Sequence, residues 1–190
     1  MDAGDGSAVV RARSGDGEAF RSLVERHSRS VFRLAYRMTG NEQDAEDVVQ
    51  ETFLRAYRQL AGYDGRASFS TWLYRIAANY SLDLIRVRKR HADRAQPVEG
   101  ERDPLDTVAA AAPGPDRLAM SGETQRLLES AMDTLSSQER TAFVLRHFEG
   151  QSIEQIGMAL GTSANATKHS IFRAVQKLRQ RLEPALTVAK

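Results

Sequence analysis

The chain contains no cysteine among its 190 residues, which excludes disulfide bonds and thiolate-ligated metal sites. Its 4 histidines are scattered, without the spacing typical of metal ligands. Apolar runs stay well short of the roughly 20 residues that a membrane-spanning helix needs, so no membrane insertion is expected. The first residues are polar and glycine-rich, unlike a signal peptide, and a cytoplasmic protein is expected.

Signs of catalysis are also missing. The acids of residues 42–51 show no ligand spacing with histidine, and no nucleophile lies in a recognisable pattern with a base. No glycine-rich loop is suited to cradle a phosphate. We therefore expect a protein that is not an enzyme, with no catalytic residues, no metal and no cofactor.

Charges of one sign are grouped along the chain, although the net charge is only +2. Residues 41–51 contain five acids and no base, whereas residues 61–90 contain six bases and two acids. Residues 164–182 contain five bases and no acid. This grouping predicts two contacts with a polyanion and one with a basic partner.

The N-terminal part predicts a disordered segment followed by a helix. Residues 1–15 are rich in Gly, Asp and Ser, which bury too little apolar surface to order a chain. From Asp16 to Gly40, apolar residues recur at three- and four-residue spacing, which is typical of a helix with one buried stripe. His27 falls on that stripe, so we interpret it as a packed histidine rather than a ligand.

The next predicted helix carries the acidic group. Asn41 is suited to cap it, and acids follow in the first turns, where the helix dipole favours negative charge. Capping does not account for all of the polar residues, because a connected strip follows at three- and four-residue spacing. The strip consists of Asp47, Gln50, Glu51 and Leu54. It is either a solvated helix face or a docking surface for a basic partner.

A polar loop at residues 61–68 precedes a helix with helical apolar spacing to about residue 85. This helix holds the only tryptophan, Trp72, among other aromatic residues, and it ends in a dense basic run. Rings beside cations suit a single nucleic-acid strand, because bases stack on rings while cations hold phosphates. The composition also fits an ordinary amphipathic helix with a solvated end. Trp72 lies on the apolar stripe and is expected to support the loop, whereas Arg75 and Asn79 should face outward.

Residues 92–122 predict a flexible linker, because four of the 5 prolines lie there and acids outnumber bases. A chain of this length has an r.m.s. span of roughly 30 Å and reaches about 100 Å when extended. Compact units are expected at 16–91 and 123–184, with a tail at 185–190.

The C-terminal unit has the pattern of a helix-turn-helix. The spacings Ser-x-x-Glu at 136–139 and Ser-x-x-Gln at 152–155 predict capping boxes. Gly161 ends the second of these helices, and a short turn leads to Ser163, the expected cap of a longer helix that should stop before Pro184. The second helix of such a motif enters the major groove of DNA.

The last predicted helix carries polar side chains opposite its apolar seam. Lys and Arg can donate to guanine, and Asn can pair with adenine. The outward residues are Asn165, Lys168, His169, Phe172 and Arg173. Phe172 lies off the seam, so contact with a thymine methyl or the sugar backbone is favoured over burial. Lys177 either touches a phosphate or is solvated.

Two segments together resemble the second conserved region of bacterial sigma-70-type initiation factors, and specifically the small extracytoplasmic-function (ECF) group. They are DAEDVVQETFLRAY at 44–57 and FSTWLYRIAANYSLDLIRVRKR at 69–90. The C-terminal unit resembles the fourth conserved region of the same family. The resemblance implies an all-α protein of two small helical domains joined by a flexible linker, which binds core RNA polymerase and directs it to promoters.

The resemblance also implies roles for individual residues. In the family, the acidic helix docks on the clamp helices of the polymerase β′ subunit, and the C-terminal region is expected at the β flap. The implied core-binding residues are Asp44, Asp47, Gln50, Glu51 and Leu54. The residues implied to bind melted −10 DNA are Asp64, Arg66, Ser68, Ser70, Thr71, Trp72, Arg75, Asn79, Arg86, Arg88, Lys89 and Arg90. The residues implied to bind duplex −35 DNA are Ser163, Asn165, Lys168, His169, Phe172, Arg173 and Lys177. A cognate anti-sigma factor is a further expected partner.

The chain departs from the family in its last helix. Ala166-Thr167 stands where Thr-Val is usual, and His169-Ser170 where a small residue and an arginine are common. The helix-turn-helix is kept, but the preferred −35 sequence stays open. Two other readings are a stand-alone helix-turn-helix regulator and a Mg²⁺-dependent nucleic-acid hydrolase. The aromatic–basic helix and the linker disfavour both.

Overall fold

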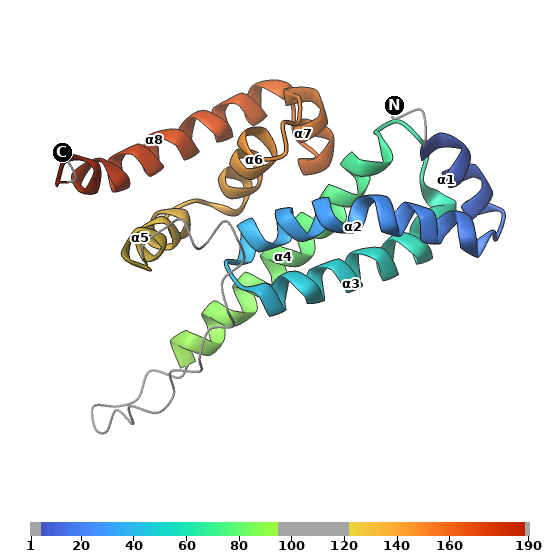
Figure 1. Cartoon of the computed structure of the whole chain (residues 1–190). Coiled ribbons are helices and arrows are strands. Elements are labelled where there is room, and N and C mark those ends of the chain that lie inside the picture. Colours follow the sequence, from blue (N-terminus) through green and yellow to red (C-terminus); the bar gives the residue numbers. More distant parts are fainter. Residues whose placement is uncertain (1–4, 95–121, 189–190) are drawn as a thin grey trace.

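A computed structural model describes residues 5–94 and 122–188, and the regular elements within these ranges are all helical (Figure 1). The predicted all-α class with two helical units is confirmed. Of the expected linker, residues 95–121 lie outside the described residues. Among the described helices, none is long and apolar enough to cross a membrane.

The N-terminal unit is built on three long helices, α2 (Gly17–Thr39), α3 (Glu42–Gln59) and α4 (Phe69–Arg94), which pack against one another. Asn41 caps α3 as predicted, and Asp16 caps α2; each accepts a backbone N–H three residues on. Gly40 ends α2 with φ 70°, a left-handed conformation that glycine adopts at little cost. The apolar stripes meet in one core, where Leu23 and Leu73 are fully buried.

The expected disorder of residues 1–15 is wrong for residues 5–13, which form helix α1 (Asp5–Arg13). Ala8, Val9 and Ala12 are buried, because α1 packs on α2 and on the short 3-10 helix η1 (Leu60–Gly62). Asp5 is also buried, and its carboxylate lies 2.8 Å from Nε2 of His27. Small apolar residues and one buried polar pair order a segment whose composition is otherwise polar.

The C-terminal unit contains α5 (Gly122–Asp133), α6 (Ser137–His147), α7 (Ile153–Leu160) and α8 (Ala164–Val188). Both predicted capping boxes are present, and Gly161 ends α7 with φ 65°. The predicted stop before Pro184 is wrong, since α8 continues to Val188. A proline removes one backbone hydrogen bond and crowds the preceding turn, which weakens a helix without obliging it to end.

The two units pack against each other through α6 on α2 and α7 on α4. Figure 1 shows α8 running along the side of the C-terminal unit that faces away from α2, α3 and α4. The loop before α4 lies close to α7, at the end of the molecule that also carries α1. This arrangement decides which of the candidate DNA surfaces are open.

Candidate nucleic-acid interface

The acidic strip of α3 lies on the surface of the N-terminal unit. Asp47 and Gln50 are exposed, and Leu54 keeps 44% of its surface accessible. Tyr57, one turn further, is 57% exposed, and its ring meets Phe20 edge-on at 5.0 Å. Tyr57 is therefore a surface aromatic residue beside the strip.

Two of the predicted core-binding acids already have partners within the chain. Glu51 accepts a hydrogen bond from Nε of Arg55 at 2.6 Å, and Asp44 forms an ion pair with Arg88. The guanidinium of Arg55 also lies 4.8 Å from the ring centre of Tyr80. Asp47 and Gln50 are therefore the most accessible polar groups of the strip.

The loop before α4 is held by its own polar groups. Gly65 turns the chain with φ 74°, and the Tyr63 hydroxyl donates to the Ala67 carbonyl at 2.6 Å. Asp64 accepts from the backbone N–H of Arg66 at 3.1 Å and pairs with its guanidinium at 3.2 Å. Asp64 therefore holds the backbone of Arg66, while the Arg66 side chain stays 87% exposed and can reach a phosphate or base.

The hydroxyl groups at the start of α4 form a small cluster. Ser68 accepts the N–H of Thr71 at 3.1 Å, as an N-cap does, and its oxygen lies 3.0 Å from Ser70 and 2.8 Å from Thr71. Thr71 is only 1% exposed, so its side chain supports the loop instead of facing solvent. Ser68 and Ser70 are partly exposed.

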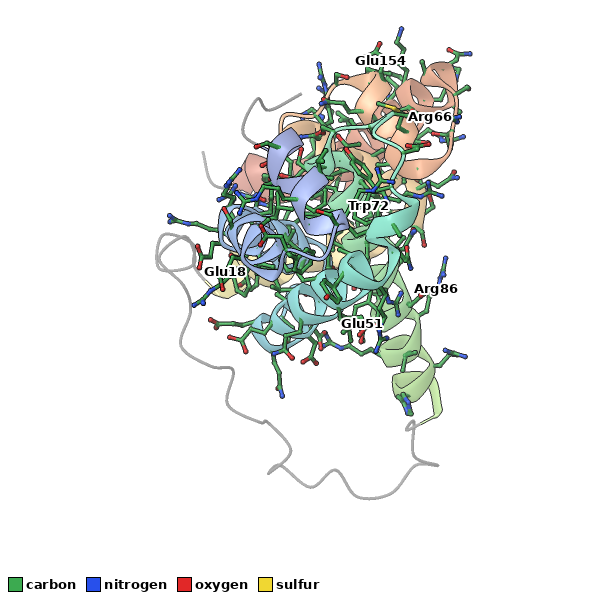
Figure 2. All side chains as sticks on the ribbon, turned by 90° about the vertical axis from the view of Figure 1, so that its right-hand side faces the viewer. Glu18, Glu51, Arg66, Trp72, Arg86 and Glu154 are labelled. Carbon is green, nitrogen blue, oxygen red and sulfur yellow. The ribbon has the colours of Figure 1, made fainter. Side chains whose placement is uncertain are left out.

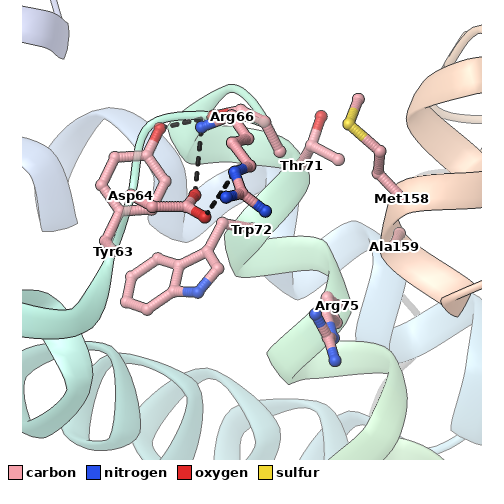
Figure 3. A pocket seen from close by; sticks show the side chains of 9 residues that line it. Tyr63, Asp64, Arg66, Thr71, Trp72, Arg75, Met158 and Ala159 are labelled. Carbon is pink, nitrogen blue, oxygen red and sulfur yellow. Dashed lines mark hydrogen bonds and ion pairs between the residues drawn. The ribbon is translucent and has the colours of Figure 1, made fainter.

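An aromatic wall backs this loop. Trp72 lies with its ring centre 5.1 Å from Tyr63 and 5.7 Å from Phe69, and Phe69 is 3% exposed. Figure 3 shows a pocket in front of the wall, lined by Asp64, Arg66, Trp72 and others. Its volume is about 250 Å³, and Met158 and Ala159 of α7 face it from the other unit.

The predicted −10 residues fall into two separate places. Arg75 and Asn79 face outward near the pocket end of α4, as expected. Arg86, Arg88 and Arg90 are exposed toward the other end of α4. In Figure 2, the labelled Arg86 lies below Arg66. The placement of the Lys89 side chain lies outside the described residues.

The outer face of α8 carries the predicted −35 residues together. Ser163 caps the helix, accepting the Ala166 N–H at 3.3 Å. Phe172 is 62% exposed and is therefore a surface residue, not part of the core. Asn165, Lys168, His169 and Arg173 are all exposed. Thr167 and Ser170 point inward, where Thr167 meets the Thr162 hydroxyl at 2.9 Å.

A buried carboxylate joins the two units, and sequence analysis did not find it. Glu149, between α6 and α7, has a side chain only 3% exposed. Its oxygens lie 2.7 Å from Arg37 and 3.8 Å from Arg33, and it accepts from the Tyr74 hydroxyl at 3.4 Å. Burial raises the pKa of Tyr74. The Arg37 guanidinium also covers the Phe148 ring at 4.5 Å.

Two further hydrogen bonds cross between the units. Arg140, which is 8% exposed, donates to the Met38 carbonyl at 3.0 Å. The Thr71 hydroxyl donates to the Gln151 side chain at 3.4 Å. No local pattern marks these residues, because their partners lie 102 and 80 positions away.

Comparison with known proteins identifies the family of both units. Residues 23–91 match the family model for sigma-70 region 2, and residues 125–178 match that for sigma-70 region 4. The chain is 39% identical over 180 residues to the ECF RNA polymerase sigma factor SigE of Mycolicibacterium smegmatis, covering 93% of this chain and 67% of the relative. It is 32% identical over 176 residues to the ECF factor SigW of Bacillus subtilis, covering 92% of this chain and 94% of the relative.

Among solved structures, the chain is similar to CnrH in complex with the cytosolic domain of CnrY. The TM-score is 0.68 with 28% identity, over 93% of this chain and 96% of that one. Both sigma regions are therefore present in this chain, with region 2 before region 4. The chain belongs to the ECF group of the sigma-70 family, the factors that direct RNA polymerase to specific promoters.

Proposed function

We propose that this sigma factor binds core polymerase through the α3 strip, captures melted −10 DNA at the loop before α4, and reads duplex −35 DNA with α8. The observation that carries the proposal is the pocket in front of Trp72. It combines a ring for stacking, the exposed guanidinium of Arg66 and the polar side chain of Asp64. Such a pocket suits one unstacked base.

The energetics are consistent with capture rather than with unaided melting. Stacking one base on an aromatic side chain contributes about 1–3 kcal/mol, and extruding a base costs a few kcal/mol. The loop can therefore hold an open strand once polymerase supplies further contacts. Arg75 and Asn79 would support that strand, and the basic end of α4 would hold phosphates.

Docking on the polymerase is assigned to the α3 strip and, by family resemblance, to the β′ clamp helices, with the C-terminal unit at the β flap. The exposed groups Asp47, Gln50 and Leu54 support this assignment. CnrH was solved with the cytosolic domain of CnrY, and a comparable protein partner, an anti-sigma factor, is proposed here. The function places the protein in the cytoplasm and requires no catalytic activity of its own.

Run-off transcription tests the proposal directly. Purified core polymerase on a genomic fragment library should yield new discrete transcripts only when the protein is added. Tight duplex binding and unchanged transcripts would instead indicate a stand-alone regulator. Cleavage that stops with chelator would indicate a nuclease.

Reversing the charge of the strip should separate core binding from folding. Asp47→Lys should weaken binding to core polymerase by about tenfold, since one opposed charge at an interface typically costs at least 1.4 kcal/mol. Glu25→Lys, at an exposed acid on α2, is the control and should bind normally. Equal affinity of Asp47→Lys and wild type in fluorescence anisotropy would refute the assigned docking face.

A further inference from the structure

Glu139 is almost completely buried at the start of α6, although it carries a carboxylate. Its side chain is 5% exposed. One oxygen accepts from the Ser136 backbone N–H at 2.8 Å and from Nζ of Lys177 at 2.7 Å. The other oxygen lies 3.2 Å from Nε of Arg173. Buried carboxylates are rare unless they are paired, and this one ties α6 to two cations of α8.

The environment keeps this carboxylate charged at neutral pH. Burial acts to raise the pKa of Glu139, but hydrogen bonds from Lys177 and from Ser136 outweigh it and hold the pKa below its usual value. A charged carboxylate attracts a guanidinium, whereas a neutral carboxylic acid carries no charge to attract it. The contact with Arg173 is therefore an ion pair at neutral pH, while Lys177 balances part of the charge.

The ion pair with Glu139 leaves the terminal nitrogens of the Arg173 guanidinium accessible. Glu139 engages Nε, so the terminal nitrogens of the guanidinium stay available, and the side chain is 60% exposed. Bidentate pairing with guanine O6 and N7 requires the plane of the fork to be set correctly. A carboxylate bound on one edge sets that plane before DNA arrives, so less rotamer freedom is lost on binding.

We propose that Glu139 is a positioning residue for −35 recognition, which orients Arg173 for bidentate reading of one base pair. The proposal rests on the assignment of α8 as the −35 reader. Lys177 neutralises Glu139 and reads no base. Glu139 itself lies inside the unit and contacts no DNA; it acts through the arginine.

The test is a selection of promoter sequences by the complete holoenzyme from DNA with a randomised −35 region. Wild type defines the preferred base at each position, and Arg173→Ala identifies the position that Arg173 reads. Glu139→Gln should lower discrimination at that same position by about fivefold, because the ion pair that restrains Arg173 is lost. The amide keeps the capping box, so α6 should still begin at its cap. Arg173→Ala/Glu139→Gln should lose no more than Arg173→Ala.

A second variant separates orientation from charge. Arg173→Lys keeps the positive charge but lacks the Nε donor and the planar fork, so it should lose the same base preference while the salt dependence of binding is retained. Asp133→Asn, which removes the ion pair of Asp133 with Arg140 at 2.7 Å, is a matched acid-to-amide control and should leave all preferences unchanged.

The outcomes distinguish the possible errors. Full base preference in Glu139→Gln or in Arg173→Lys would overturn the positioning role. A uniform loss of affinity at every position, with a lowered melting temperature, would show that Glu139 only stabilises the unit. Absence of any selected −35 sequence with wild type would instead refute the proposed function of α8.

Discussion

The two surfaces assigned to promoter DNA differ in how open they are. The loop of residues 63–68 faces a pocket closed on one side by Met158 and Ala159 of α7. The outer face of α8 lies on the side of the C-terminal unit that is turned away from the N-terminal unit, and its Phe172 is 62% exposed. In this structure, duplex DNA could approach α8 directly, whereas a base entering the pocket would lie against α7.

The difference has an identifiable physical origin. α7 is placed beside the loop by contacts between the two units, chiefly those of the buried Glu149 with Arg37 and of Arg140 with the Met38 carbonyl. Access to the loop therefore depends on how the units dock, while access to α8 depends only on the C-terminal unit. Three experiments can break or sharpen this contrast.

The largest effect is expected from Glu149→Ala, which should uncover the loop and leave α8 unchanged. Hydrogen bonds to charged groups contribute about 1.5–3 kcal/mol each, so the separated arrangement should become roughly 10- to 100-fold more populated. Because Trp72 is the only tryptophan, its fluorescence reports this directly. Acrylamide should quench the variant more strongly than wild type.

Glu25→Ala is the control for the loss of a carboxylate. Its ion pair with Arg21 is exposed, because the two side chains keep 69% and 70% of their surface accessible. Exposed ion pairs contribute little to stability. Trp72 quenching in this variant should match wild type. Equal quenching in Glu149→Ala and wild type would mean that Glu149 does not hold the loop covered.

A smaller effect is expected where α7 and α8 meet. A Cβ at Gly157 would lie 2.9 Å from the Thr162 carbonyl oxygen, which is backbone and cannot yield easily. Gly157→Ala should destabilise the C-terminal unit by about 1–3 kcal/mol through overpacking. Hydrogen exchange should show faster exchange in α7 and α8 with little change in α2 to α4.

Gly6→Ala in α1 is the matched substitution in the N-terminal unit. No atom lies within 4 Å of the added Cβ, so this change should be neutral or stabilise by up to about 1 kcal/mol. If Gly157→Ala is also neutral, the close approach of α7 to the turn is not as tight as the structure indicates.

The smallest effect is expected from pH. The pKa of Glu139 is lowered in the folded protein, so its contribution is present above the unfolded value of about 4.5 and is lost as pH falls through the folded pKa. The difference in unfolding free energy between wild type and Glu139→Gln should therefore shrink below about pH 4.5. Urea unfolding followed by circular dichroism at several pH values measures it; a constant difference would contradict the pKa shift.

Helix ends and helix faces were predictable because they depend on neighbours within a few residues. Asn41, Gly40, both capping boxes and the outward side of α8 were all confirmed. The helix-turn-helix followed from the same local rules. The boundaries that failed, at α1 and at Pro184, failed where a local signal was overridden: polar composition by packing on α2, and proline by continuation of the helix.

Contacts between distant residues could not be predicted in the same way. Arg37 lies 112 positions from Glu149, and Lys177 lies 38 from Glu139, and no periodicity links such pairs. The pairing of Asp44 with Arg88 likewise became visible only once α3 and α4 were packed, whereas the pair of Glu51 with Arg55 is a local contact within α3. These contacts determine which of the predicted binding residues are already paired within the chain.

The amino-acid sequence by itself determined the helices, their caps, the two sigma regions and the types of residue available for polymerase and DNA. Periodicity and capping act over three or four residues, so they can be recognised without a fold. Only the tertiary structure decided that α7 lies beside the loop before α4, that Thr71 supports this loop from within, and that Glu139 pairs with Arg173. Packing between helices sets these relations, and it depends on side chains far apart in the chain.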